Sequence, residues 1–254
     1  MSEEQSCSQL TFMPCPEATG PIRVDQLQRA REPVSRSKSG VQGKVADVFH
    51  GRSRHAESQN ELHAFRILLA TARADAWQEQ PFVMHYHHEG AKHRYTPDIL
   101  VVWRAHQEVI EVKDDAEAEL PENRARFARI GGLLAEHGYQ FRVWKRSAIM
   151  AEPRLTNANL VLRYRSVAVS VAERERLRRV LSSTPEMRLG ALAETSQAPV
   201  QTVVRLVLEG ALHLDWWKPL NLDSTVSTVP IGPQIWPVPP WTVSPNAFLE
   251  IGCR

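Results

Sequence analysis

Two carboxylates and a lysine lie in aliphatic segments that otherwise have the composition of buried strands. Asp98 follows Pro97 and opens the run ILVVW, and Glu111 and Lys113 lie in the segment EVIEVK. Side chains two positions apart on a strand point to the same face, so Glu111 and Lys113 emerge together. A hairpin that returns between the two runs brings Asp98 close to Glu111, because both lie a similar distance from the turn.

Two carboxylates that meet on a sheet repel each other unless a cation lies between them. Oxygen ligands of this kind favour Mg²⁺, with Mn²⁺ as a substitute. Such an ion lowers the pKa of a bound water and stabilises charge on a phosphoryl oxygen, while Lys113 beside it orients the water or neutralises the transition state. The pattern predicts metal-dependent phosphodiester hydrolysis; the competing interpretation is a surface ion pair on an edge hairpin.

A wider series of motifs surrounds these residues. GRSRHAESQNELHAF, WQEQP, RYTPDILV and EVIEVK follow one another and precede a basic helix and the strand FRVW. TPDILV with EVIEVK resembles the PD-(D/E)xK nuclease motif, and the whole series, over residues 50–150, resembles the N-terminal nuclease domain of TnsA, the endonuclease subunit of heteromeric transposases.

This resemblance implies a function and a site. It implies a DNA endonuclease that cleaves the 5′ ends of a mobile element, together with a TnsB-like transposase subunit and a TnsC-like regulatory ATPase. A glutamate from the first helix completes the site in such nucleases, and Glu61 is the matching position. We therefore expect Glu61, Asp98 and Glu111 to hold the metal and Lys113 to assist hydrolysis. The alternative for Glu61 is a capping box with Ser58, in which the carboxylate only binds the backbone.

Two other functions remain open. One is a stand-alone restriction or repair-type nuclease with the same core. The other is a catalytically inert assembly factor that binds DNA or a partner protein, which the intact quartet of site residues disfavours.

The elements expected around the site are those of an α/β domain. A helix begins near Ser58, two strands meet at a Glu89–Gly90 turn, and a long helix after Pro121 leads into a last strand. We expect a restriction-endonuclease-like mixed sheet flanked by helices over residues 45–152. Gln78, Glu79 and Gln80 are expected to shape the site or its border.

The flanking segments differ from this domain in composition. Residues 1–44 predict a flexible arm, and residues 223–254 predict a Pro-rich tail. Between them, residues 153–222 show three short helical patterns and a hairpin, the order of a winged-helix-like domain. Such a domain contacts protein as often as DNA.

Several further residues are candidates for contacts with DNA or metal. DNA contacts are expected at Arg124, Arg126 and Arg129 on the helix after the site, and at Gln201, Thr202 and Arg205 on a recognition helix. For the three arginines on the first of these helices, a solvated helix face is the alternative. His85 and His87 share a strand face, but without a third well-spaced ligand they indicate a partly exposed strand rather than a zinc site.

Composition excludes other classes of protein. Of the 254 residues, 43% are hydrophobic and 24% charged, with a net charge of +2, which is ordinary for a globular protein. No apolar run is long enough to span a bilayer, so we expect no membrane association. Cys7, Cys15 and Cys253 form no CxxC pair, and the polar, acidic N-terminus does not resemble a secretory signal. The expected location is cytoplasmic.

Overall fold

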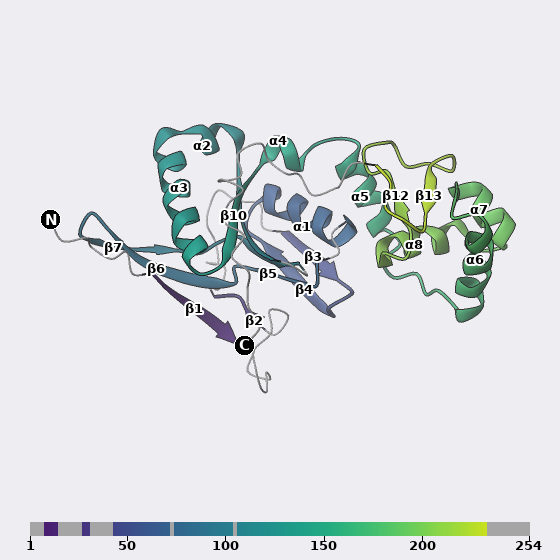
Figure 1. The fold of residues 1–254 in the computed structure, drawn as a ribbon, viewed down its shortest axis with the longest axis horizontal. Helices are drawn as coiled ribbons and strands as arrows, with labels where there is room; N and C mark the ends of the chain where they lie inside the picture. The colour runs from purple at the N-terminus through teal and green to yellow at the C-terminus, as the bar shows by residue number, and fades with distance from the viewer. Residues whose placement is uncertain (1–7, 15–26, 31–42, 72–73, 104–105, 233–254) are drawn as a thin grey trace.

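The computed structural model describes residues 8–14, 27–30, 43–71, 74–103 and 106–232 (Figure 1). The three cysteines lie outside these ranges, as do most of the expected N-terminal arm and the tail from residue 233 onward. No helix in the described ranges is long and apolar enough to cross a bilayer.

A four-stranded sheet forms the centre of the N-terminal part. Its strands, in spatial order, are β10 (Tyr139–Lys145), β9 (Gln107–Lys113), β8 (Ile99–Val102) and β5 (Ala76–Glu79). The pairs β8–β9 and β5–β8 are antiparallel, whereas β9 and β10 are parallel. A parallel pair needs a crossover connection, and α2 (Asp115–Glu119) and α3 (Pro121–Glu136) supply it.

Helices cover both faces of this sheet. Ile99, Ile110 and Val112 share a buried cluster with Phe65 of α1 (Gln59–Thr71). The alternate strand residues, Leu100, Val109 and Val143, belong to a second cluster with Ile130 of α3. Both faces are buried, so β8 is entirely apolar (ILVV), and β9 is buried from Glu108 to Val112 although it contains two glutamates. The expected mixed α/β sheet flanked by helices is confirmed.

A second sheet lies beside the first, and it corrects the predicted strands. Its order is β2 (Leu27–Gln28), β1 (Gln9–Pro14), β6 (Phe82–His88) and β7 (Ala91–Tyr95), all antiparallel. The two strands expected on either side of the Glu89–Gly90 turn are each divided between the two sheets. Before the turn they are β5 and β6, and after it β7 and β8. The first breaks at Gln80, whose φ of 43° is left-handed, and the second breaks before Asp98. Glu89 and Gly90, with φ of 50° and 73°, form the predicted turn between β6 and β7.

The N-terminal residues differ from the expected flexible arm. Strands β1 and β2 join the second sheet, and β3 (Gly43–Asp47) pairs with β4 (Arg52–Ala56). Phe12 packs on Phe82 with ring centroids 5.2 Å apart, and Leu10 is also partly buried in that cluster. The two apolar side chains are spaced for a strand, but polar and proline-rich flanks obscure the pattern.

The C-terminal part contains short helices and a small sheet. The helices are α4 (Arg146–Ile149), α5 (Arg154–Leu162), α6 (Val171–Ser183), α7 (Leu189–Ser196) and α8 (Val200–Glu209). The sheet has the order β11 (Glu186–Arg188), β13 (Thr225–Ser227), β12 (His213–Leu214). The hairpin predicted before residue 222 is right in its first strand, β12, but wrong in its second, because β12 pairs with β13. It extends into the expected tail because Val226 is fully buried.

Helix α5 joins the two parts of the chain. It packs against α1 on one side and α8 on the other, and all three helices contribute to one buried cluster. The Asn157 side chain donates to the carbonyls of Trp216 (3.0 Å) and Lys218 (2.8 Å) and accepts from the Leu220 amide (3.0 Å). The loop between β12 and β13 is therefore anchored to α5 by the hydrogen bonds of Asn157.

Candidate active site

Asp98 lies where β7 leads into β8, opposite Glu111. The register pairs Ile99 with Ile110, so the preceding residue, Asp98, faces Glu111 across the hairpin. The Val112 amide donates to Asp98 Oδ2 at 2.7 Å. Burial, then the charges of Glu111 and Glu61, raise the pKa of Asp98 well above its usual range. The three predicted metal ligands therefore share one electrostatic environment.

Glu111 is buried and held from two sides. Its Oε2 accepts a hydrogen bond from the Tyr95 hydroxyl at 2.8 Å, and Lys113 Nζ lies 3.3 Å from its Oε1. Burial and the nearby carboxylates raise the pKa of Tyr95, so its hydroxyl stays protonated and donates. Partial burial opposes charge on Lys113, but Glu111 and Asp98 outweigh it and raise the pKa of Lys113. The lysine is therefore a fixed positive charge at neutral pH.

Glu61 lies in the first turn of α1 and caps that helix. Ser58 Oγ accepts from the Glu61 amide (3.1 Å) and donates to Glu61 Oε1 (2.9 Å), while the Glu57 amide donates to Glu61 Oε2 (2.9 Å). Burial raises the pKa of Glu61 despite these hydrogen bonds. The capping interaction is therefore present, and it is made by the same carboxylate whose charge raises the pKa of Asp98.

The carboxylates are not gathered around a common point. In the described part of the chain, no three His, Cys, Asp or Glu side chains are placed to hold a metal ion as they stand. The cap engages Glu61, and Tyr95 with Lys113 engages Glu111. The donor set is nevertheless entirely oxygen and rich in negative charge, as Mg²⁺ requires. The buried side-chain oxygen of Gln80, Oε1, accepts no hydrogen bond from any described residue. The backbone N–H of Gln80 donates to the backbone carbonyl of Asp98 (2.9 Å). The residues fit a divalent ion, provided that existing contacts are exchanged for it.

A buried ion network borders the site, and no sequence motif predicts it. Arg54 is fully buried, and its guanidinium donates to Asp47 Oδ2 (2.8 and 2.9 Å) and to Glu79 Oε2 (3.1 Å). Its carbon Cζ lies 4.1 Å from the Trp77 ring centroid. Arg52 also lies 3.6 Å from Glu79 Oε1. Glu79 is therefore neutralised by two arginines, which suits a residue at the border of the site.

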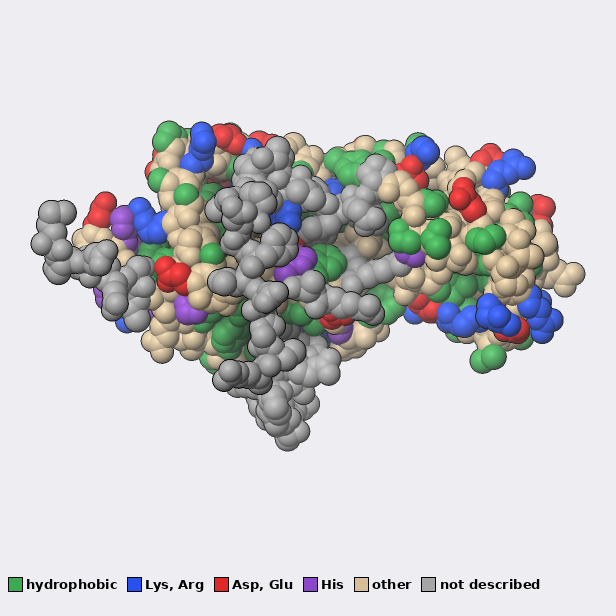
Figure 2. Space-filling model, in the orientation of Figure 1, with side chains coloured by type: hydrophobic (Ala, Val, Ile, Leu, Met, Phe, Trp, Pro, Cys, Tyr) green, Lys and Arg blue, Asp and Glu red, His purple; other side chains and the backbone are tan. Residues whose placement is uncertain are grey.

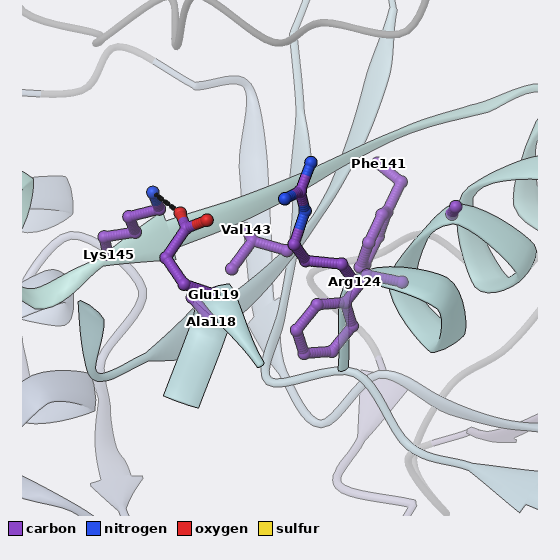
Figure 3. A pocket seen from close by; sticks show the side chains of 8 residues that line it. Ala118, Glu119, Arg124, Phe141, Val143 and Lys145 are labelled. Atoms are coloured by element: carbon purple, nitrogen blue, oxygen red, sulfur yellow. Dashed lines mark hydrogen bonds and ion pairs between the residues drawn. The ribbon is translucent and has the colours of Figure 1, made fainter. Parts of the chain in front are cut away.

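A cavity of about 330 Å³ lies beside the site between α2, α3 and β10 (Figure 3). Lys145 and Glu119 form an ion pair at one side of it, and Arg124 lines it from α3. Lys145 is the register partner of Lys113 on the neighbouring strand, so the cavity and the lysine share a face of the sheet. Arg124 is therefore placed at this cavity.

The other two arginines of α3 lie differently. The guanidinium carbon of Arg126 is 5.9 Å from the ring centroid of Tyr95, the residue that binds Glu111. Arg129 is half-buried further along the helix. Arg126 thus links this helix to a residue of the candidate site.

The expected recognition helix, α8, does not expose the residues predicted on it. Thr202 is buried and donates to Glu173 Oε1 at 3.0 Å. Arg205 lies 3.2 Å from Glu209 and 5.1 Å above the ring of Phe49, which comes from the β3–β4 turn. Only Gln201 is exposed. The prediction of an outward DNA-reading face is wrong for Thr202, which is buried and bound to Glu173 of α6. It is also wrong for Arg205, which faces Phe49 of the N-terminal part.

Comparison with known proteins supports the resemblance drawn from the motifs. The family model described as TnsA-like endonuclease N terminal matches residues 73–145. This range contains Asp98, Glu111 and Lys113 but begins after Glu61. No curated protein matches the chain. The resemblance is thus confirmed for residues 73–145, a TnsA-like endonuclease segment, which indicates a nuclease of the transposition type.

Proposed function

We propose that the protein is a Mg²⁺-dependent DNA endonuclease that cleaves the 5′ ends of a mobile element as one subunit of a heteromeric transposase. The observation that carries the proposal is the position of Asp98 opposite Glu111 on the hairpin, with Lys113 Nζ 3.3 Å from Glu111 Oε1. Burial and the charges of Glu111 and Glu61 raise the pKa of Asp98 there. Carboxylates with pKa values raised in this way gather at sites that bind metals or perform catalysis. The TnsA-like match over the same segment supports DNA as the substrate and TnsB-like and TnsC-like proteins as partners.

The roles of the side chains follow from their contacts. Glu61, Asp98 and Glu111 would hold the metal, which lowers the pKa of a bound water and balances charge on the scissile phosphate. The Val112 amide orients Asp98, and the Tyr95 hydroxyl orients Glu111. The Lys113 ammonium stabilises negative charge that develops on the phosphate oxygens. Arg124, Arg126 and Arg129 would contact the backbone of the DNA.

We further propose that α6, α7 and α8 with the β11–β13–β12 sheet are a winged-helix-like unit that contacts a partner protein. The chain order of helices and strands supports this assignment. The covered side of α8 favours contact with protein over reading of DNA, because Arg205 faces Phe49 rather than solvent. A TnsB-like or TnsC-like subunit is the partner that the TnsA-like segment suggests.

Replacing Lys113 with methionine tests the proposed chemistry. Methionine keeps the length and packing of the side chain but removes the charge, so we expect cleavage to fall by about a hundredfold or more. The assay measures strand cleavage of duplex DNA that carries the element ends, in Mg²⁺ or Mn²⁺ and in EDTA, with and without the partner subunits. Equal cleavage by Lys113→Met and the unaltered protein would refute the site. Cleavage of unrelated DNA by the chain alone would favour the stand-alone nuclease.

Replacing Glu61 with glutamine separates its two roles. The amide retains an acceptor for the Glu57 amide, so the cost to the free energy of unfolding is at most about 1 kcal/mol. A lost metal ligand, in contrast, lowers cleavage by about a hundredfold or more. The matched control is Ser58→Ala, which removes the cap partner, costs about 0.5–2 kcal/mol and leaves the carboxylate in place. If Glu61→Gln cleaves as well as the unaltered protein, Glu61 is only a cap.

A further inference from the structure

The hairpin of β6 and β7 extends from the end of the molecule farthest from the C-terminal helices (Figure 1). In its register His85 pairs with Arg94 and His87 with Lys92. Directly opposed residues of an antiparallel pair project from the same face, so these four side chains share one side. We call this side, defined by His85, His87, Lys92 and Arg94, the basic ribbon face. Figure 2 shows blue and purple side chains, with red ones among them, at this end of the molecule.

The opposite side of the hairpin is its packed side. Met84, Tyr86 and Tyr95 are buried there in the cluster beneath α3. On the basic ribbon face, His87, Lys92 and Arg94 are exposed and His85 is half-buried. The hairpin thus has one side fixed to the protein and one side free to meet a ligand.

Neither Lys92 nor Arg94 forms an ion pair with any described residue. By contrast, Arg178 and Arg179 on α6 are both held by Glu175, at 2.8 and 3.3 Å. Positive charges on one face repel each other, and this repulsion remains in the folded protein. Binding of an anionic ligand reduces it.

The face also lies close to the candidate active site along the chain. Arg94 directly precedes Tyr95, whose hydroxyl binds Glu111. Lys92 precedes Asp98 by six positions (98 minus 92), so at about 3.3 Å per extended residue it lies on the order of 20 Å away at most. That distance is shorter than one turn of duplex DNA, about 34–36 Å.

We propose that the basic ribbon face binds the phosphate backbone of duplex DNA within one helical turn of the cleaved bond. The inference rests on the proposed nuclease function and adds a surface to it. Lysine and arginine contacts with phosphate position the protein without reading sequence. The face therefore contributes affinity for any duplex, whereas the choice of element ends is made elsewhere.

The salt dependence of DNA binding tests this surface. The probe is a mixed-sequence duplex, and binding to the full chain is measured in EDTA, which prevents cleavage, over a series of salt concentrations. Each phosphate contact contributes about −0.9 to the slope of log K against log salt. For the double variant Lys92→Gln/Arg94→Gln we expect the slope to become shallower by roughly 1.8, with affinity at low salt reduced about tenfold or more.

The matched control is Arg178→Gln/Arg179→Gln, which removes the same formal charge from the opposite end of the molecule. We expect it to keep the slope of the unaltered protein. An unchanged slope and affinity in Lys92→Gln/Arg94→Gln would overturn the basic ribbon face, as would an equal loss in the control. If the unaltered protein binds no duplex at all, the basic ribbon face is overturned. The proposed nuclease function is judged separately, by cleavage in Mg²⁺ with the partner subunits present, so the two failures are distinguishable.

Discussion

Replacing Asp98 with asparagine is expected to abolish DNA cleavage and, at the same time, to raise the stability of the protein. Asp98 is a proposed metal ligand, and its loss is expected to lower cleavage by roughly three orders of magnitude or more. The gain in stability arises because the asparagine side chain is neutral and its amide oxygen still accepts the hydrogen bond from the Val112 amide. Each kcal/mol gained corresponds to about 2–4 °C in Tm for a chain of this size.

The dependence of this gain on pH follows from the raised pKa of Asp98. Burial and the neighbouring carboxylates penalise its ionised form in the folded state, so the folded pKa lies above the unfolded one. Below the unfolded value of about 3.9 both states are protonated, and the penalty is absent. It grows as the pH rises above that value and is complete above the folded pKa. The excess stability of Asp98→Asn is therefore present at neutral pH and vanishes near pH ~3.

Thermal unfolding at the two pH values measures this effect, and Asp115→Asn is the control of opposite sign. Hydrogen bonds from Ser147 lower the pKa of Asp115, so its charge stabilises the fold above the unfolded pKa and that contribution is lost in acid. Mn²⁺ adds a second readout, since a bound ion raises the Tm of the unaltered protein but not that of Asp98→Asn. A less stable Asp98→Asn at neutral pH would contradict the electrostatic account of the site.

Replacing Arg54 with methionine is expected to lower the free energy of unfolding by about 3–5 kcal/mol. The arginine is fully buried between Asp47 and Glu79, and its removal leaves the buried Asp47 and Glu79 carboxylates without this cation, with Arg52 as the remaining arginine beside Glu79. Chemical denaturation measures the change. The exposed ion pair of Arg178 with Glu175 is the comparison, and Arg178→Met is expected to produce no measurable loss.

A combined variant tests the reason for this loss. In Arg54→Met/Asp47→Asn/Glu79→Gln the unpaired charges are gone, so we expect about half or more of the lost stability to return. No recovery would mean that the contact of Arg54 with Trp77, at 4.1 Å, matters more than the charges. Full stability in the single variant would show that the network contributes little.

The sequence predicts those parts of the site that depend only on residues close together in the chain. The hairpin of Asp98 with Glu111 follows from equal distances to a turn, and the face shared by Glu111 and Lys113 follows from strand alternation. The Glu89–Gly90 turn is local in the same sense. These features need no knowledge of distant contacts.

The features that the sequence analysis missed depend on distant partners. A buried arginine such as Arg54 has the same spacing on its strand as an exposed one, and only Asp47 and Glu79 distinguish it. Gln80 ends a strand by adopting a left-handed conformation that its type does not favour. Arg205 faces Phe49 across the two parts of the chain. Periodicity along one segment contains none of this information.

The position of α5 between α1 and α8 has a consequence for cooperativity. Because these helices share one buried cluster, melting of the C-terminal helices would expose the inner side of α1, whose first turn holds Glu61. The whole described chain is then expected to unfold in a single calorimetric transition rather than in two. A partner protein that binds the C-terminal helices would, through the same cluster, reduce the fluctuations of α1, the helix that contains Glu61. It would thereby change the rate of cleavage without contacting the scissile bond.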